Sequence, residues 1–353
     1  MLQLDGRDGG GQLVRTALSL SAVTGQAICI ENVRGGRPNP GLKPQHVAAI
    51  ETVGRATEAT VSGVERESER FSFAPETVRG GAFAVEVGTA GSVALVCDAV
   101  APLAVALDRP LTVTLHGGTD VQWSPPVDYL REVKLPLLRA VGLDAELAVH
   151  QRGFYPVGGG SLTLTIRPSS LTALRLRRRG SIERLSVYAL ASDSLESASV
   201  AERLAETVRE RIEDGSKGEM VTETAEIETT AEIETTATYA ETDCPGAVVT
   251  LVADCGTSRA GFDALGRRGV PAEDVADEVV DAFRAWRATG APVDEHLGDQ
   301  LLVWLALAGG EVRMPHSTDH VETNAELIRA FEYDLQVGDS ERGVVASAPS
   351  PEE

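Results

Sequence analysis

Lysine is scarce in this chain, whereas carboxylates are abundant. Only three of the 353 residues are lysine (Lys43, Lys134 and Lys217), while 53 are Asp or Glu and the formal net charge is −21. This balance argues against general attraction to polyanions, because phosphate binding draws on Lys and Arg. It is typical of a high-salt cytoplasm, where ions screen repulsion among carboxylates. Net charge then reports the habitat, and local arginine clusters must indicate function.

Cysteine is also sparse, and no apolar run is long enough to cross a membrane. The four cysteines lack CxxC spacing, so neither a metal ribbon nor a disulfide framework is indicated, and the pattern favours buried thiols at Cys29, Cys97, Cys244 and Cys255. The apolar segment 93–107 is interrupted by Asp98 and Pro102 and is shorter than the roughly 20 residues of a membrane span. The first residues, MLQLDGRDGGGQ, do not resemble a signal peptide. We expect a soluble cytoplasmic protein without a membrane partner.

The length predicts two domains, or one domain with an insert. Apolar periodicity predicts helices at 13–23, 47–59, 93–105, 126–138, 198–212, 271–288 and 296–307, and strands at 71–73, 83–87, 111–115, 145–149, 161–166, 184–189 and 247–253. Glycine turns that recur between strands and helices favour a repeated α+β architecture. Near Ser181 the pattern changes, and a tandem AEIETT repeat at 225–236 is either an edge hairpin or an exposed extension.

A glycine run precedes the first predicted helix. Asp8 is followed by Gly9, Gly10, Gly11 and Gln12, and then by the apolar segment 13–23. Backbone amides at such a helix start could bind a phosphate. A simple glycine-rich turn without a ligand would have the same sequence pattern. Asp8 could bind Mg²⁺ or cap the helix.

Positive charge is concentrated in one loop, RGGRPNPGLKPQH. It combines Arg34, Arg37 and Lys43 with the polar residues Gln45 and His46 at the start of the next helix. In so acidic a chain this cluster favours an anion site over a solvated loop. We expect both arginines to grip phosphate as forks.

The segment EVRMPHSTDHVETN at 311–324 places two histidines four residues apart before a predicted Thr-Asn helix start. Metal ligands and solvated loop residues are the alternative interpretations. An HExxH zinc site would need a glutamate after His316, where Ser317 stands instead. The positive pole of a helix disfavours imidazolium and attracts anions. His320 is therefore the candidate nucleophile toward phosphorus.

Seven motifs in order resemble the RNA 3′-terminal phosphate cyclase family. They are DGGGQLVRTALSLS, RGGRPNPGLKPQH, GTAGS, GGTDVQWSPPVDY, RGFYPVGGG, EHLGDQLL and HSTDHVETN. The resemblance covers nearly the whole chain except the AEIETT repeat and the last dozen or so residues, and the composition suggests an archaeal, halophilic member.

The resemblance implies a fold and a reaction. The fold is α+β, with a large domain of three repeated βαβαββ-like units (1–180 and 262–340), a smaller inserted α/β domain (181–261) and a flexible tail (341–353). The reaction is ATP-dependent conversion of an RNA 3′-phosphate to a 2′,3′-cyclic phosphodiester, releasing AMP and pyrophosphate. It passes through a covalent adenylate on His320 and an RNA-adenylate.

The resemblance also implies the roles of further residues. Pro126 and Tyr129 would pack against adenine, and Asp8 would bind a divalent cation, Mg or Mn. Asp8, Asp98 and His296 stand where the family usually has glutamate, glutamine and tyrosine. The other residues expected to bind ATP are Arg15, Arg34, Arg37, Gln45, Asp98, His296, Leu297, Gly298, Asp299 and Gln300.

Two other functions stay open. A cyclase-like ribosome-assembly protein without adenylation activity would lack the nucleophilic histidine, whereas His320 is present. An enolpyruvyl-transferase-like enzyme would have a related repeated architecture without needing the HSTDH segment. The physiological RNA, the preferred metal and the oligomeric state are not indicated.

Overall fold

The computed structural model describes residues 1–88, 90–218 and 231–350. Within these residues, four sheets of four strands each, with helices packed between and around them, give a mixed architecture of helices and strands. The predicted α+β class is confirmed at this level. The first AEIETT copy, 225–230, lies outside the described residues.

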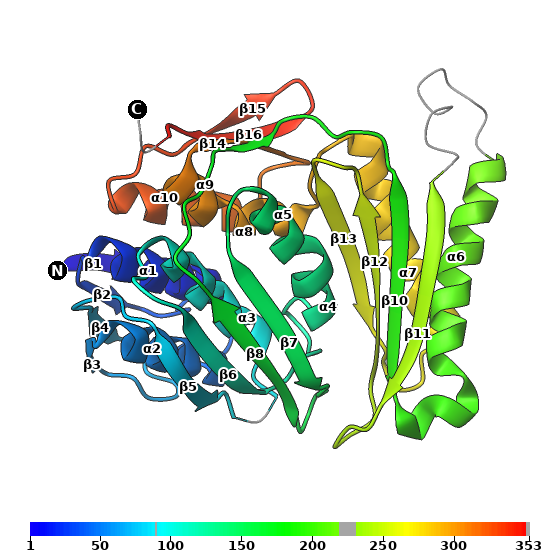
Figure 1. Ribbon diagram of the computed structural model, residues 1–353, viewed down its shortest axis with the longest axis horizontal. Coiled ribbons are helices and arrows are strands. Elements are labelled where there is room, and N and C mark those ends of the chain that lie inside the picture. The colour runs from blue at the N-terminus through cyan, green and yellow to red at the C-terminus, as the bar shows by residue number, and fades with distance from the viewer. Residues whose placement is uncertain (89, 219–230, 351–353) are drawn as a thin grey trace.

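The first two sheets form the amino-terminal part of the molecule (Figure 1). The first has the order β1-β2-β4-β3 and the second β5-β6-β8-β7. The strands of the first are β1 (Leu2–Asp5), β2 (Ile28–Glu31), β3 (Thr60–Ser62) and β4 (Phe71–Ala74), with helices α1 (Gly10–Thr24) and α2 (Pro44–Thr57). The second contains β5 (Gly81–Glu86), β6 (Leu111–Gly117), β7 (Ala145–Gln151) and β8 (Gly160–Ile166), with α3 (Val93–Val100), the 3-10 segment η1 (Ala101–Val105), α4 (Val127–Tyr129), the π segment η2 (Leu130–Lys134) and α5 (Leu135–Ala140).

A third sheet joins segments that are far apart in the sequence. Its order is β15-β16-β14-β9, and β9 pairs with β14 in parallel although the whole fourth sheet lies between them in the chain. Its elements are β9 (Leu174–Leu176), β14 (Gly310–Met314), β15 (Gln336–Ser340) and β16 (Gly343–Ala348), with helices α8 (Glu295–Gln300), α9 (Leu302–Ala308) and α10 (Asp319–Ala330). In each of these three sheets the two strands that come first in the chain pair in parallel, namely β1 with β2, β5 with β6 and β9 with β14. The remaining pairs are antiparallel.

The fourth sheet stands to one side, on the right in Figure 1. It has the order β11-β10-β12-β13 and is covered on one face by two long helices. The elements are β10 (Arg184–Ser192), η3 (Asp193–Ala198), α6 (Val200–Gly218), β11 (Glu232–Ala240), β12 (Ala247–Asp254), β13 (Arg259–Leu265) and α7 (Ala272–Thr289). The second AEIETT copy falls largely in β11, an edge strand parallel to β10.

Two main apolar cores match this division. One lies among the first three sheets and their helices. The other runs from Ile182 to Ala291 and includes Phe283 and Trp286 of α7, which pack on Phe262. The second core therefore extends past the predicted boundary at residue 261, because α7 buries its apolar face on the small sheet.

A proline explains the π segment between α4 and α5. Pro136 has no N–H, so the carbonyl of Glu132 one turn earlier loses its usual helical partner. That carbonyl instead accepts a hydrogen bond from Nη1 of Arg259 in the small sheet, at 2.9 Å. The local break in the helix thus becomes a contact between the two parts of the molecule.

The end of the chain corrects one prediction. Residues 341–353 were expected to be flexible, but Gly343–Ala348 forms β16 and pairs with both β14 and β15. Val344 and Ala346 alternate into the core, a two-residue period typical of a strand. The Pro, Ser and Glu composition of the last residues hid this short signal.

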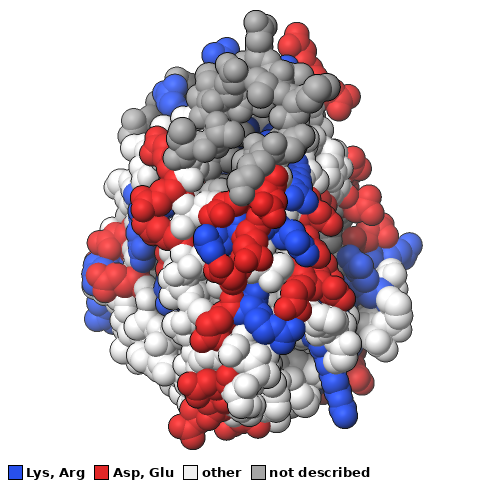
Figure 2. Space-filling model, turned by 90° about the vertical axis from the view of Figure 1, so that its right-hand side faces the viewer, with Lys and Arg blue, Asp and Glu red and all other residues white. Residues whose placement is uncertain are grey.

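Charged side chains of both signs cover the face formed by the small sheet's helices (Figure 2). Arginines of α6 pair with acids of α7, as in Arg203 with Glu273 at 2.7 Å and Arg211 with Asp277 at 2.9 Å. Their positive charge is therefore engaged locally.

The described residues include no helix long and apolar enough to span a membrane. Cys29, Cys97 and Cys255 are buried, as expected, whereas Cys244, which was also expected to be buried, is half-buried.

Candidate active site

The start of α10 presents His320. Thr318 caps this helix, its hydroxyl accepting from the backbone N–H of Val321 at 3.2 Å, so His320 occupies the first turn. The helix start predicted near residue 323 is therefore too late, because Thr318 and not Thr323 is the cap. His316 lies outside the helix, exposed, with Nε2 3.5 Å from a carboxylate oxygen of Glu295.

The start of α1 faces the same point. Gly10 has φ of +58°, a conformation that favours glycine. A Cβ built on it would lie 3.4 Å from Nη2 of Arg37 and 3.8 Å from Cε1 of His320. Gly11 packs against His46, since a Cβ there would lie 2.5 Å from Nε2 of that ring. Glycines thus let the imidazole and the guanidinium approach the uncapped amides of a helix start, an arrangement suited to anions.

A hydrogen-bond chain fixes the imidazole of His320. Nδ1 lies 2.9 Å from Oε1 of Gln12. The amide nitrogen of Gln12 donates to the carbonyl of Asp299 at 3.2 Å, and Asn324 donates to the same carbonyl at 3.3 Å. Because that carbonyl can only accept, Oε1 of Gln12 must face His320, and Nδ1 must carry the proton. The lone pair is then on Nε2.

The surroundings keep this ring neutral. Partial burial, followed by the nearby cations Arg37 and Arg15, lowers the pKa of His320 below its ordinary value. A neutral imidazole near neutral pH has a lone pair available for attack on an electrophile.

The two arginines of the basic loop differ in their contacts. Arg34 has φ of +55°, and its Nη1 donates to the carbonyls of Asn39 at 2.8 Å and Gly41 at 3.2 Å. Arg37 is exposed and close to Gly10. Arg34 therefore stabilises the loop, whereas the side chain of Arg37 lies beside Gly10 at the start of α1.

The first turn of α2 adjoins this loop. His46 is buried there, with Nδ1 accepting from the backbone N–H of Lys43 at 2.9 Å, and burial lowers its pKa to about 3. Gln45 lies half-buried in the same turn.

A buried lysine bridge lines a small cavity together with Gln12 and Asn324. Nζ of Lys134 donates to Asp98 at 2.6 Å and to Oε1 of Gln300 at 2.9 Å. Burial lowers the pKa of Arg15, opposed by the nearby carboxylates of Asp98 and Asp299. Asp98 thus has a cationic partner within the protein, and its negative charge is balanced without a metal.

The segment 296–300 is divided between packing and the site. Leu297 is fully buried, and a Cβ on Gly298 would lie 2.5 Å from Met314, so these two residues pack α8 on β14. His296 is exposed and Asp299 half-buried. Burial raises the pKa of Asp299 to about 7, with His296 and Arg15 opposing the rise. Of these four residues, only His296 and Asp299 have side chains available to a ligand.

Tyr129 is held inside the protein. It is 1% exposed, and its hydroxyl donates to Asp294 at 2.8 and 2.9 Å. Asp294 in turn caps α8 through the N–H of Leu297 at 2.9 Å and accepts from Gly261 at 2.9 Å. Pro126, directly before α4, is also buried. In this conformation Tyr129 fixes the start of α8.

Asp8 is exposed, with its carboxylate beside Gly36 of the basic loop. No group of three or more His, Cys, Asp or Glu residues that could hold a metal occurs within 1–88, 90–218 and 231–350. A single carboxylate still suits Mg²⁺, which commonly takes one or two carboxylates and completes its shell with phosphate oxygens and water.

Several residues of this site were not singled out from the sequence. In the sequence, Gln12 stands out only as the end of a glycine run, and Lys134 only as one of three lysines. Rarity was the usable signal for Lys134, because a chain that avoids lysine retains it where a buried cation is needed. Nothing local marks Asn324 or Asp294, whose partners lie far along the chain.

A histidine with a lowered pKa, an exposed arginine and two helix starts that meet at one point form an arrangement suited to phosphate-bearing molecules. Comparison with known proteins agrees with this class. The family described as RNA 3′-terminal phosphate cyclase matches residues 7–334. The chain belongs to the RNA 3′-terminal phosphate cyclase family, whose members are ligase-class enzymes.

Its relatives come from both archaea and bacteria. An RNA 3′-terminal phosphate cyclase of Halobacterium salinarum is 45% identical, over 97% of this chain and 98% of the relative. That of Ectopseudomonas mendocina is 37% identical (94% and 92%), and that of Pyrococcus furiosus 35% identical (98% and 98%). A solved EPSP synthase from Acinetobacter baumannii has a TM-score of 0.35 at 10% identity, covering 98% of this chain and 64% of that one, and supports no inference here.

Proposed function

We propose that this protein converts an RNA 3′-terminal phosphate to a 2′,3′-cyclic phosphodiester with ATP, through an adenylate on His320. The observation that carries this proposal is the bond from His320 Nδ1 to Gln12, which leaves Nε2 unprotonated beside Arg37 and the start of α1. The names of the relatives support the same reaction. The fold proposal that accompanies it is of three βαβαββ units with the small α/β domain inserted in the third.

The chemistry proceeds in three displacements. Nε2 of His320 attacks the α-phosphorus of ATP, and pyrophosphate leaves. An oxygen of the RNA 3′-phosphate then attacks the same phosphorus, and the imidazole leaves, giving an RNA-adenylate. Finally the 2′-hydroxyl attacks the activated 3′-phosphorus, loses its proton and expels AMP. DNA lacks that hydroxyl and would not react.

The side chains and backbone amides of the site would neutralise phosphate charge and position the nucleotide. Arg37, Arg15 and the amides at the start of α1 stabilise the phosphate charge that builds up during the first displacement. His296 and Asp299 line the nucleotide side, while Lys134 holds Asp98 and Gln300 in place. Asp8 would hold one divalent cation, Mg or Mn, which supplies charge neutralisation at the phosphates when bound.

Incubation with α-labelled ATP and metal tests the proposal. The protein should acquire label that is acid-labile and alkali-stable, as a phosphoramidate is. With RNA that ends in a 3′-phosphate, the label should leave as AMP and the RNA end should become cyclic. Absence of labelled protein in an otherwise folded preparation would favour the alternative of a non-catalytic ribosome-assembly protein.

Gln12→Glu should shift the pH dependence of self-adenylation. Partial burial and then the neighbouring cations keep the wild-type pKa of His320 below its ordinary value, so the rate should fall only in acid. A carboxylate at position 12 stabilises imidazolium, so the fall should begin at higher pH. Gln12→Met should slow adenylation about tenfold at every pH, because the orienting hydrogen bond is lost. Identical pH profiles for the wild type and Gln12→Glu would contradict the assigned tautomer.

Arg37→Ala and Arg34→Ala should separate catalysis from loop stability. Losing Arg37 should raise the activation free energy of adenylation by about 1.5–3 kcal/mol, the contribution of one charge-assisted hydrogen bond. The melting temperature should not change. Losing Arg34 should also lower the melting temperature, because its guanidinium ties two carbonyls of the loop. Arg37→Lys is the control, since it retains charge but not the fork. Full activity in Arg37→Ala would remove this residue from the site.

A further inference from the structure

Two of the few aromatic side chains stand in solvent on neighbouring loops. Aromatics make up 4% of the chain. Trp123, between β6 and α4, is 95% exposed, and Tyr155, between β7 and β8, is 72% exposed. The other two tryptophans, Trp286 and Trp304, are buried. Trp and Tyr are enriched at interfaces, because each side chain combines an apolar ring with a polar group that can form a hydrogen bond.

The two loops are fixed to each other. Asp120 and Phe154 form a β-bridge, and the N–H of Thr119 donates to the carbonyl of Gly153 at 3.0 Å. Phe154 packs on Val248 of the small sheet. The exposed aromatics are therefore carried by a rigid support and not by loose chain.

The backbone at Trp123 is also unusual. Its φ is +61°, a region that bulky residues rarely adopt. Such strain persists only where the surroundings impose it, and it clusters at functional sites. Here the strained turn leaves the indole outside the core.

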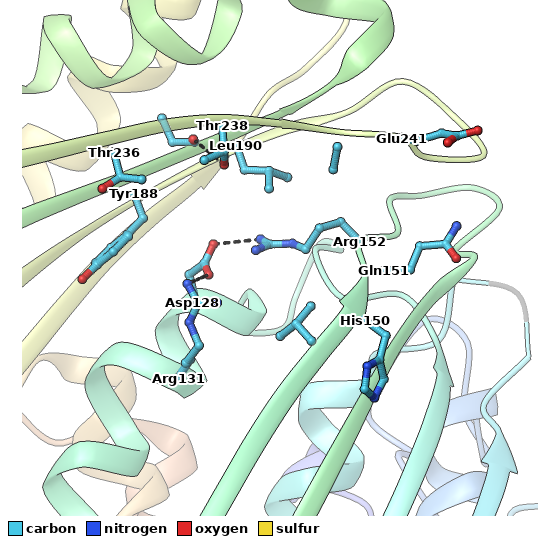
Figure 3. A pocket seen from close by; sticks show the side chains of 13 residues that line it. Asp128, Arg131, His150, Gln151, Arg152, Tyr188, Leu190, Thr236, Thr238 and Glu241 are labelled. Atoms are coloured by element: carbon cyan, nitrogen blue, oxygen red, sulfur yellow. Dashed lines mark hydrogen bonds and ion pairs between the residues drawn. The ribbon is translucent and has the colours of Figure 1, made fainter.

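The loop of Tyr155 adjoins a cleft of about 720 Å³ that lies between β7 and the strands β10 and β11 of the fourth sheet. Gln151 and Arg152 line it and are separated from Phe154 only by Gly153, and Glu241 follows β11 on the opposite wall (Figure 3). The cleft is also lined by the hydrogen-bonding side chains of His150, Tyr188, Thr236 and Thr238. Such groups suit bases and riboses better than a run of bare phosphates.

A chain of neighbouring residues runs from the aromatic loops to the candidate active site. Asp120, which forms the bridge to Phe154, is near Asp263, and Asp263 is near His296. His296 is in turn near His320. Trp123 follows Asp120 by three residues.

We propose that Trp123 and Tyr155 form a stacking platform for nucleobases of the RNA strand upstream of its 3′ end. Every base has a π face, so aromatic stacking holds a single strand without reading its sequence. A strand held in this way needs few free cations, which agrees with an acidic protein whose α6 arginines are engaged in ion pairs. This proposal rests on the proposed function, because it presumes an RNA substrate.

Alanine variants at both positions test the platform. In Trp123→Ala and Tyr155→Ala, the KM for an RNA of about ten nucleotides with a 3′-phosphate should rise about tenfold, the effect of losing one stacked base. Self-adenylation with ATP alone should not change. Trp123→Phe should nearly restore the KM, since a ring remains. Val61→Ala, which truncates an exposed side chain on β3, is the matched control.

Tryptophan fluorescence gives a reading independent of catalysis. The same RNA should quench the wild-type emission through Trp123, and Trp123→Phe should abolish the quenching because the remaining tryptophans are buried. An unchanged KM in the alanine variants, together with no quenching of the wild type by RNA, would overturn the platform. Loss of self-adenylation in Trp123→Ala would also overturn it, because the indole would then lie at the nucleotide. A variant that altered only the sedimentation coefficient would point to a protein contact instead. If the wild type formed no adenylate but RNA still quenched Trp123, the proposed function would fail and the platform would stand.

Discussion

His320→Ala is expected to abolish both self-adenylation and RNA cyclisation. The imidazole is the only side chain at the meeting of α1 and α10 that we assign as a nucleophile, and its loss leaves no atom to form the phosphoramidate. Labelled-ATP incubation followed by denaturing electrophoresis measures the first step. Conversion of a 3′-phosphorylated RNA to its cyclic form measures the second.

His316→Ala is the matched control for this loss. His316 lies outside α10 and contacts only the exposed carboxylate of Glu295 among the groups described, so its removal should be much milder. The melting temperatures of both variants should stay near the wild-type value, because neither ring is part of an apolar core. Uptake of AMP by His320→Ala would refute the assignment of the nucleophile.

Arg152→Ala is expected to produce the largest loss of stability. Its guanidinium is buried and donates to Asp120 at 2.7 and 2.8 Å and to Asp128 at 2.8 Å. Removing the cation leaves two carboxylates buried next to each other. A broken buried ion pair costs about 3–5 kcal/mol, and urea unfolding would measure that decrease in the free energy of unfolding.

An exposed arginine shows how far burial decides the effect. Arg167 pairs with Asp144 at 2.9 Å and Glu146 at 3.2 Å, and both acids are exposed. Arg167→Ala should therefore cost only about 0.2–1 kcal/mol. Equal losses in the two variants would mean that Arg152 is not holding the buried carboxylates as we infer.

Local patterns were enough to locate most of the helices and central strands. The apolar period after the glycine run predicted a helix at 13–23, and α1 covers Gly10–Thr24. The apolar stretch at 247–253 predicted a strand, and β12 covers Ala247–Asp254. Such segments have one face or both faces in the core, so their periodicity is written in the sequence. β9 has only three residues, and the two-residue period of β16 was hidden by the Pro, Ser and Glu composition of the end of the chain.

The site was harder to predict because its contacts are distant in sequence. The glycine turn and the arginine loop pointed to an anion site from composition alone. However, the tautomer of His320 depends on Gln12, whose orientation depends on the carbonyl of Asp299. The roles of Tyr129 and Arg34 likewise follow from partners that only the fold brings near. The residue types were visible in the sequence, but their partners were not.

The bond between Gln12 and His320 joins positions 308 residues apart and has a consequence for biosynthesis. The glycine turn emerges from the ribosome early, whereas α10 emerges only after the entire small sheet has been made. Contacts of such high sequence separation form late and slowly in folding. A nascent chain thus carries the arginine loop and the helix start for most of its synthesis without the histidine that would let it consume ATP. Activity should appear in one step, when the last part of the chain has folded onto the first.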